Sequence, residues 1–239
     1  MAKTLGSSSI ITLNQIPTCD GKGKVAYYED FESLYFTSTF GAAIISRWTS
    51  SMQGAAGAGG YVQPRTNWSK SGHRSVTLMT HAVLNSQPTL TVYLPRPQSR
   101  RIGFEFSFVL GASIQDITLW SYIYNRDRFE HEAFLRIEPQ SAQLSYWDVN
   151  GGWASLSGLE TAPIAGFTYT VKLVIDQESG QYARVWFNGV TYLMNGVSYM
   201  KFPMAFAYNY ILLQIIARPS AAVNAAISVD DFILTEDEP

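Results

Sequence analysis

Two glutamates separated by one residue are the nearest approach to a catalytic pair in this sequence. Glu130 and Glu132 alternate with His131, so on an extended strand both carboxyl groups share one face and the imidazole takes the other. Glycoside hydrolysis uses such pairs, one carboxyl group as the acid and the other as base or nucleophile. However, the stretch 125–128 carries two arginines that can pair with these glutamates at a solvated strand entry. We therefore predict that the protein is not an enzyme.

Other reactive side chains are scattered. His73, His81 and His131 do not pair at metal-ligand spacing, and none stands beside a serine nucleophile motif. Cys19 is the single cysteine, which excludes a Cys-rich zinc site and an intrachain disulfide. The glycine-rich run 54–60 lacks the Lys-Ser/Thr ending of a phosphate-binding loop. We expect no cofactor.

Aromatic side chains offer a different chemistry, because the faces of sugar rings pack on Trp and Tyr. In the stretch 117–124, alternation places the aromatic residues opposite Leu119 and Ile123, so one of the two sets faces away from the core. Packing inside the core is the competing interpretation for each aromatic residue. The candidate glycan-binding residues are Trp120, Tyr122, Tyr124, Tyr146 and Trp186.

The composition of the chain excludes two classes of partner. The net charge is −2 and the pI is near 5.9, so there is no basic excess to neutralise phosphates and we expect no nucleic-acid partner. No run approaches 18 apolar residues, so we expect no membrane span. The first 17 residues lack the apolar core of a signal peptide, which predicts synthesis in the cytoplasm.

The elements that must position these side chains are strands. The clearest is the hairpin 169–189, in which apolar residues alternate on both sides of the turn 176–180. Asn188-Gly189 then predicts a type I′ turn into a third strand, 190–194. Further strands are expected at 25–31, 75–83, 90–94, 102–110, 117–124, 134–137, 144–148, 211–217 and 227–234. This spacing, without long helical segments, predicts an all-β protein, built as an antiparallel two-sheet sandwich.

Two parts of the chain differ in composition. Residues 1–24 contain a flexible Gly/Ser run at 6–9 and a polar Gly/Lys run at 20–24, and are expected to form an extended N-terminal arm. Residues 25–239 carry the strand pattern and are expected to form one domain.

The order of several segments resembles a known family. Glu-Asp-Phe ends the first strand, and FEFSF precedes the stretch 135–153, LRIEPQSAQLSYWDVNGGW. The hairpin VKLVIDQESGQYARVWFNG and the closing strand SVDDFIL come later. This order resembles the concanavalin A-like lectin/glucanase superfamily, the jelly roll shared with laminin-G-like domains. The resemblance implies two curved sheets with a concave face that binds glycans in many relatives. Retaining hydrolases of that superfamily carry Glu-x-Asp-x-Glu or Glu-x-Asp-x-x-Glu on one strand, and this chain has neither.

The resemblance also implies that the first and last strands are neighbours. That pairing would bring together four carboxylates, Glu29, Asp30, Asp230 and Asp231. Four such groups repel one another unless a hard cation lies among them, so structural calcium is one hypothesis. In the alternative, Asp30 and Asp231 face water while Phe31 and Phe232 point inward.

The function we expect is that of a non-catalytic structural or attachment protein. The N-terminal arm would add a strand to a neighbour, either a second copy or another structural subunit. A protein made in the cytoplasm with such a fold suits the surface of a virus particle, as a capsid decoration or tail component. The first alternative is a carbohydrate-binding, lectin-like module. The second is a glycoside hydrolase or lyase, which requires Glu105, Glu132 or Glu138 to lie near a second carboxylate in a cleft.

Overall fold

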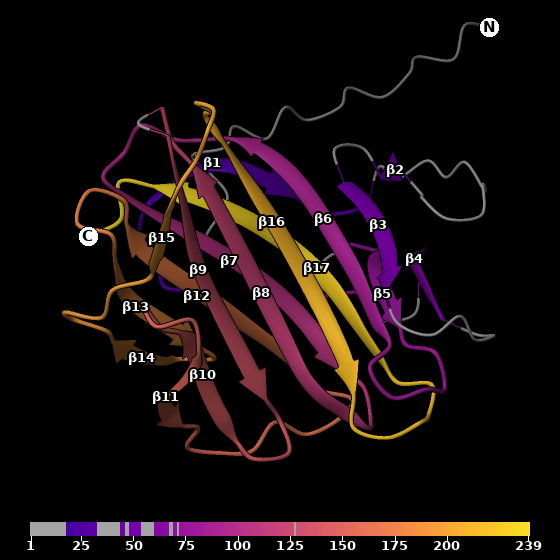
Figure 1. Cartoon of the computed structure of the whole chain (residues 1–239). Coiled ribbons are helices and arrows are strands. Elements are labelled where there is room, and N and C mark those ends of the chain that lie inside the picture. Colours follow the sequence, from indigo (N-terminus) through magenta and orange to yellow (C-terminus); the bar gives the residue numbers. More distant parts are fainter. Residues whose placement is uncertain are drawn as a thin grey trace, which may run out of the picture.

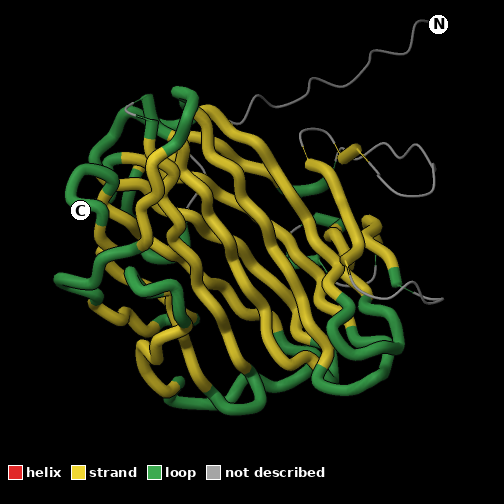
Figure 2. The backbone as a smooth tube through the Cα atoms, viewed as in Figure 1, coloured by secondary structure: helices red, strands yellow, loops and turns green. Residues whose placement is uncertain are grey.

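Two antiparallel sheets face each other in the computed structural model (Figure 1). The structure describes residues 18–32, 44–45, 48–53, 60–66, 69–70, 72–126 and 128–239. Strands and their connecting loops make up these residues (Figure 2). Among them, no helix is long and apolar enough to cross a membrane. The predicted all-β sandwich is confirmed.

The front sheet of Figure 1 has nine strands. Their order is β11 (Trp153–Gly158), β10 (Gln143–Trp147), β9 (Phe129–Glu138), β8 (Ile114–Tyr124), β16 (Tyr210–Pro219), β6 (Gln87–Pro95), β3 (Trp48–Gln53) and β2 (Ile44–Ile45), with β15 (Met200–Pro203) paired to β9. The strand predicted at 211–217 is β16, which lies between β8 and β6 inside the sheet. Its inner face is buried, and Leu212 and Gln214 on its outer face are partly exposed.

The back sheet has eight strands. Their order is β14 (Val190–Leu193), β13 (Gln181–Phe187), β12 (Thr168–Asp176), β7 (Arg101–Leu110), β17 (Ala226–Glu236), β5 (Ser75–Met79) and β4 (Tyr61–Arg65), with β1 (Lys24–Glu29) paired to β17. The first and last of the strongly alternating segments are thus neighbours, as the resemblance implied: Glu29 lies opposite Phe232.

The core fills the space between the sheets. Phe104, Phe106 and Phe108 of β7 point into it, as do Leu119 and Ile123 of β8. The alternation read from the sequence therefore assigns these faces correctly, because a strand turns successive side chains to opposite sides. Both faces of β17 are buried, in contrast, so the back sheet is covered on its outer side as well.

The hairpin at 169–194 is confirmed in register. Lys172 of β12 pairs with Trp186 of β13, and Phe187 pairs with Val190 of β14 across the turn. Asn188 and Gly189 have φ angles of 47° and 101°. Positive φ at both central residues is what a type I′ turn requires, and the sequence supplies the two residue types that tolerate it best.

The described part of the arm lies on its own domain. Strand β1 begins at Lys24, and the segment just before it contributes Cys19 and Asp20 to contacts with the back sheet. The predicted boundary after residue 24 stays a prediction. Residues 1–17 and most of the run 54–60 lie outside the described residues.

Candidate functional site

The outer face of the front sheet carries the aromatic residues predicted from β8. Trp120, Tyr122 and Tyr124 point away from the core and are each partly exposed. Phe134 of β9 lies opposite Trp120 in register, and their rings stack at 5.1 Å with planes inclined by 18°. The ring of Tyr122 meets the same Phe134 at 5.0 Å, edge to face. Phe134 is thereby the centre of an aromatic floor.

Two tryptophans extend this floor toward the edge of the sheet. Trp147 of β10 lies 5.9 Å from Phe134, between ring centroids, and Trp153 of β11 lies 5.3 Å from Trp147. The guanidinium of Arg136 stands 4.5 Å above the ring of Trp153. We call the set Trp120, Tyr122, Phe134, Trp147 and Trp153 the aromatic face. Two of its five members, Trp120 and Tyr122, are among the predicted glycan-binding residues.

A group of tyrosines continues the same side of the sheet toward β6. Tyr124 packs 4.5 Å from Tyr210, which also contacts Tyr208 at 5.6 Å and Tyr93 at 5.7 Å. Tyr93 is 54% exposed. Because a phenol combines an apolar ring with a polar hydroxyl, this extension can pack against a ligand and form hydrogen bonds with it.

Carboxyl groups stand beside the aromatic face. Glu130 and Glu132 lie opposite Tyr124 and Tyr122, so both face outward as alternation predicts. Burial raises the pKa of Glu130 above its usual range. Burial also raises the pKa of Glu132, and the nearby charge of Glu130 adds to the rise, against an opposing hydrogen bond from Trp147. Both groups can therefore hold a proton and donate it to a ligand at a higher pH than an ordinary glutamate can.

The aromatic face also holds polar hydrogens without acceptors. Within the described residues, the indole nitrogen of Trp120 and Nε of Arg136 are buried and have no hydrogen-bond partner. An unmade hydrogen bond of this kind costs roughly 1–3 kcal/mol, so an acceptor supplied by a ligand would be favoured. Aromatic rings with hydrogen-bond donors beside them suit a polyhydroxylated ligand.

Two of the predicted glycan-binding residues lie elsewhere, which corrects the grouping. Tyr146 shares the parity of the core residue Leu144 and packs inward against Tyr182, with ring centroids 5.6 Å apart. Trp186 belongs to the back sheet, where it pairs with Lys172. Successive residues of β10 point to opposite sides, so Trp147 points outward where Leu144 and Tyr146 point inward. The outward position of Trp147 could therefore have been predicted from the alternation in this strand.

The four carboxylates predicted to hold calcium do not form one cluster. Glu29 accepts hydrogen bonds from the Tyr27 hydroxyl and the Phe31 amide, and Asp30 accepts one from the Glu32 amide. Asp230 accepts the amide of Lys70 at 2.6 Å, and Asp231 accepts the hydroxyl of Tyr28 at 2.9 Å. Phe31 and Phe232 are both fully buried in the core, as the alternative interpretation expects, but Asp231 is 8% exposed and does not face water as that interpretation also expected.

Glu105 and Glu138 are already engaged. Glu138 lies 3.2 Å from Arg136 and accepts the hydroxyl of Ser145. Glu105, on the outer side of the back sheet, accepts the amide of Cys19. Burial raises the pKa of Glu105, and burial together with the charge of Glu105 raises that of the Cys19 thiol.

A different set of possible metal ligands occurs on the back sheet. In the described part of the chain, the group whose ligand atoms all lie within 4.8 Å of one another is Cys19, Asp20 and Glu105. Lys172 already places its ammonium 2.8 Å from Asp20 and 3.9 Å from Glu105. Positive charge is thus supplied there by the protein itself, which disfavours a metal cation.

Comparison with solved structures decides the fold. The cellulose induced protein Cip1 aligns with 87% of this chain and 96% of its own, at 13% identity and a TM-score of 0.54. The chain has the concanavalin A-like lectin/glucanase fold. An endo-β-1,4-glucuronan lyase from the fungus Trichoderma reesei aligns with 89% of this chain and 96% of its own, at 13% identity and a TM-score of 0.53. The carbohydrate recognition domain of Emp47p aligns with 87% and 96%, at 14% identity and a TM-score of 0.50.

The concanavalin A-like fold is thus shared by an endo-β-1,4-glucuronan lyase and by a carbohydrate recognition domain. At identities of this size the likeness shows the fold alone, and a fold does not fix a function. No family model matches the sequence, and no curated protein matches it. The function must therefore be argued from the aromatic face and the groups around it.

Proposed function

We propose that the protein is a carbohydrate-binding β-sandwich and that its ligand lies on the aromatic face. The observation that carries this proposal is the grouping of Trp120, Phe134, Trp147 and Trp153 on the outer side of one sheet. The core between the sheets does not account for them, because it lies on the other side of the same strands, although Phe134 is only 4% exposed among its aromatic neighbours. The Trp120 indole and the two glutamates give the site donors and acceptors for hydroxyl groups.

Two of the structures that share the fold support this proposal, because their names refer to carbohydrates. They are the carbohydrate recognition domain of Emp47p and an endo-β-1,4-glucuronan lyase. The aromatic face crosses the strands β8, β9, β10 and β11, which are spaced about 4.8 Å apart. A ligand that follows this row would span roughly 15 Å, the distance across four strands. Such a length suits an oligosaccharide better than a single sugar.

Titration with a panel of soluble oligosaccharides tests the proposal. Binding should quench tryptophan fluorescence, and Trp120→Ala should weaken affinity by tenfold or more, since a central aromatic contact is worth about 2 kcal/mol. Trp186→Ala is the matched control, because it removes the same side chain from the other sheet. If no glycan binds, or if both variants weaken binding equally, the aromatic face is not the site.

We further propose that binding is not followed by hydrolysis or lysis of the ligand. Glu130 and Glu132 lie two residues apart on one strand, about 7 Å along it, a separation that inverting hydrolases also use. Catalysis requires one group as acid and one as base, yet burial raises the pKa of both glutamates in the same direction. Release of reducing ends or unsaturated products that Glu132→Gln abolishes would make the protein an enzyme instead.

Assembly into a larger particle, such as a virus particle, is the second function that we propose. Large apolar side chains are exposed in the stretch 202–208, where Phe206 is 68% exposed and Phe202 38%. Exposed apolar groups of this kind are enriched at contacts between subunits. The N-terminal arm would add to the contact, but residues 1–17 lie outside the described residues. Light scattering in dilute solution tests this function: a monomer at all concentrations would contradict self-assembly.

A further inference from the structure

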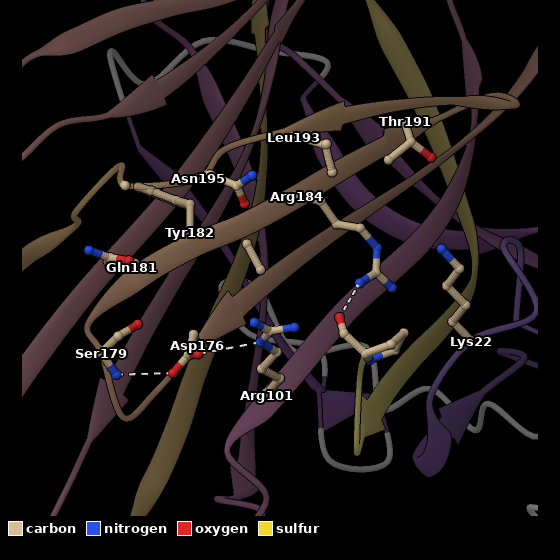
Figure 3. A pocket seen from close by; sticks show the side chains of 13 residues that line it. Lys22, Arg101, Asp176, Ser179, Gln181, Tyr182, Arg184, Thr191, Leu193 and Asn195 are labelled. Carbon is tan, nitrogen blue, oxygen red and sulfur yellow. Dashed lines mark hydrogen bonds and ion pairs between the residues drawn. The ribbon is translucent and has the colours of Figure 1, made fainter.

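A polar pocket of about 430 Å³ lies against strands β13 and β14 of the back sheet. Tyr182, which lines it, reaches the front sheet, where its hydroxyl accepts a hydrogen bond from the Phe134 amide and donates one to the Trp147 carbonyl. The turn between β12 and β13 forms one side of it, and β14 forms another. Figure 3 shows the guanidinium of Arg184, from β13, between the side chains of Lys22 and Arg101. Its volume falls within the range of roughly 300–1,000 Å³ that is usual for small-ligand sites.

The charges lining the pocket are unequal. Lys22, Arg101 and Arg184 contribute three cations, whereas Asp176 contributes the one side-chain carboxylate among the lining residues. Behind the lining, Asp20 and Glu238 pair with Arg184, so Lys22 is the cation of the three that has no ion pair among the described residues. The oxygen atoms of Asp176 are already occupied, since Oδ1 accepts the amides of Glu178 and Ser179. Its Oδ2 accepts Nε–H groups from Arg100 and Arg101. This carboxylate therefore has little capacity left to accept hydrogen bonds from a ligand.

Arg184 holds a donor that the protein does not use. Its terminal nitrogens donate to the carbonyl of Pro239 at 2.9 Å, to Asp20 at 3.0 Å and to Glu238 at 2.5 Å. Its Nε, by contrast, is buried and has no acceptor in the part of the chain that the structure describes. The residue as a whole is only 5% exposed. A buried guanidinium N–H without an acceptor is costly, so an acceptor brought by a ligand would be favoured.

Lys22 adds a positive charge at the rim of the pocket. Its backbone is fixed, because its carbonyl accepts the ammonium of Lys172 at 2.9 Å and its amide donates to Asp20. Its side chain is exposed, and among the described residues no carboxylate lies within ion-pair distance of its ammonium. Gln181, Thr191 and Asn195 line the same pocket and supply neutral hydrogen-bonding groups.

We propose that this pocket binds a small anion, a carboxylate, sulfate or phosphate group, through Lys22 and the free Nε–H of Arg184. Charge-assisted hydrogen bonds to such groups are the strong ones, and Arg and Lys are the side chains that form them. Two sources can carry this chemistry: a free oxyanion, or an acidic sugar such as a uronate. The site goes beyond carbohydrate binding at the aromatic face, because it lies on the other sheet.

The experiment is a calorimetric titration of the full chain at constant ionic strength. The probes are inorganic phosphate, sodium sulfate, methyl glucuronide and the neutral methyl glucoside. Lys22→Ala should weaken anion binding by about tenfold, the loss of one charge-assisted contact. Lys24→Ala is the matched control: it removes the same charge two residues away, where Lys24 pairs with Asp237 outside the pocket.

A spectroscopic measurement keeps the test independent of the variants. In the wild-type protein, the Nε–H resonance of Arg184 should shift on addition of the anion, in step with the calorimetric saturation. Binding of phosphate or sulfate alone assigns a free oxyanion, and binding of the glucuronide alone assigns an acidic sugar. Saturation that is absent, equal for the neutral glucoside, or unchanged by Lys22→Ala would overturn the proposal.

Discussion

Lys172 has a side chain that is completely buried, at 0% exposure. Its ammonium lies 2.7 Å from Glu238 and 2.8 Å from Asp20, and it also donates to the carbonyl of Lys22. A buried charge is tolerated only when partners replace its lost hydration. Here the partners come from segments near the two ends of the described chain, so one side chain fastens both of them to the back sheet.

Replacing Lys172 with methionine tests that role. The variant should lose about 3–5 kcal/mol of unfolding free energy, because buried carboxylates of Asp20 and Glu238 would remain without this partner. Urea denaturation at neutral pH measures the loss. Lys24→Met is the control and should be nearly neutral, since its pair with Asp237 is exposed on both sides. Equal stability of the two variants would contradict the role assigned to Lys172.

Glu105 gives the buried cluster a dependence on pH. Burial raises its pKa, so the folded state binds this proton more tightly than the unfolded state does. Its contribution to stability is therefore complete below the unfolded pKa, about 4.3, and is lost as pH rises through the higher folded value. We expect Glu105→Gln to gain in stability relative to the wild type as pH rises from about 4 to 7.

Asp176 is the control for Glu105, because its pKa is shifted in the opposite direction. Burial pulls the pKa of Asp176 upward, but hydrogen bonds from the Ser179 amide, Arg100 and Arg101 outweigh it, and the pKa is lowered. The stabilisation by Asp176 is present above its unfolded pKa and is lost as pH falls, so Asp176→Asn should cost most at neutral pH. The measurement is the unfolding free energy of each variant relative to the wild type, as a function of pH. If the two differences changed with pH in the same direction, the opposite pKa shifts given to Glu105 and Asp176 would be wrong.

Among the strands, the hairpin formed by β12, β13 and β14 could be predicted almost completely. Its register follows from local signals, the alternation on both strands and the Asn188-Gly189 turn. The long-range neighbours of the same strands could not be predicted so directly. Strand β17 departs from regular pairing with β7 between Asp230 and Ile233, where Asp231 has a φ of 48°. Both aspartates beside this bulge are buried because both faces of β17 are covered, which the local sequence does not show.

Gly189→Ala tests the turn. Gly189 has a φ of 101°, and a Cβ added there would meet no atom within 4 Å, so the cost is one of backbone conformation alone. We expect a loss of about 1–2 kcal/mol in unfolding free energy. Gly152→Ala is the control, because a Cβ there would meet only Asp148 at 3.9 Å and the backbone has no positive φ. Two equally destabilised variants in thermal denaturation would exclude the conformational explanation.

At the scale of the whole molecule, the two outer surfaces have different chemistry. The front sheet exposes aromatic rings, whereas the back sheet is covered by an ionic cluster and bears the polar pocket. The sandwich itself could be predicted from strand spacing, because alternation is local. The aromatic face could be predicted only in part, since bringing Trp147 and Trp153 beside Phe134 depends on pairing of β9, β10 and β11 in register.

The packed core between the sheets leads to a final prediction about the two proposed sites. No described side chain belongs to both, and each site is built on its own sheet. Tyr182 lines the pocket and hydrogen-bonds with the backbone of Phe134 and Trp147, but it is only 1% exposed, and close packing holds such a side chain in one arrangement. Coupling requires a ligand to favour one of two arrangements of the fold. Glycan affinity should thus be the same with and without saturating phosphate, and the effects of Trp120→Ala and Lys22→Ala should add within about 0.5 kcal/mol. A glycan affinity that changes tenfold with phosphate would show that the sheets move together and that the two sites act as one.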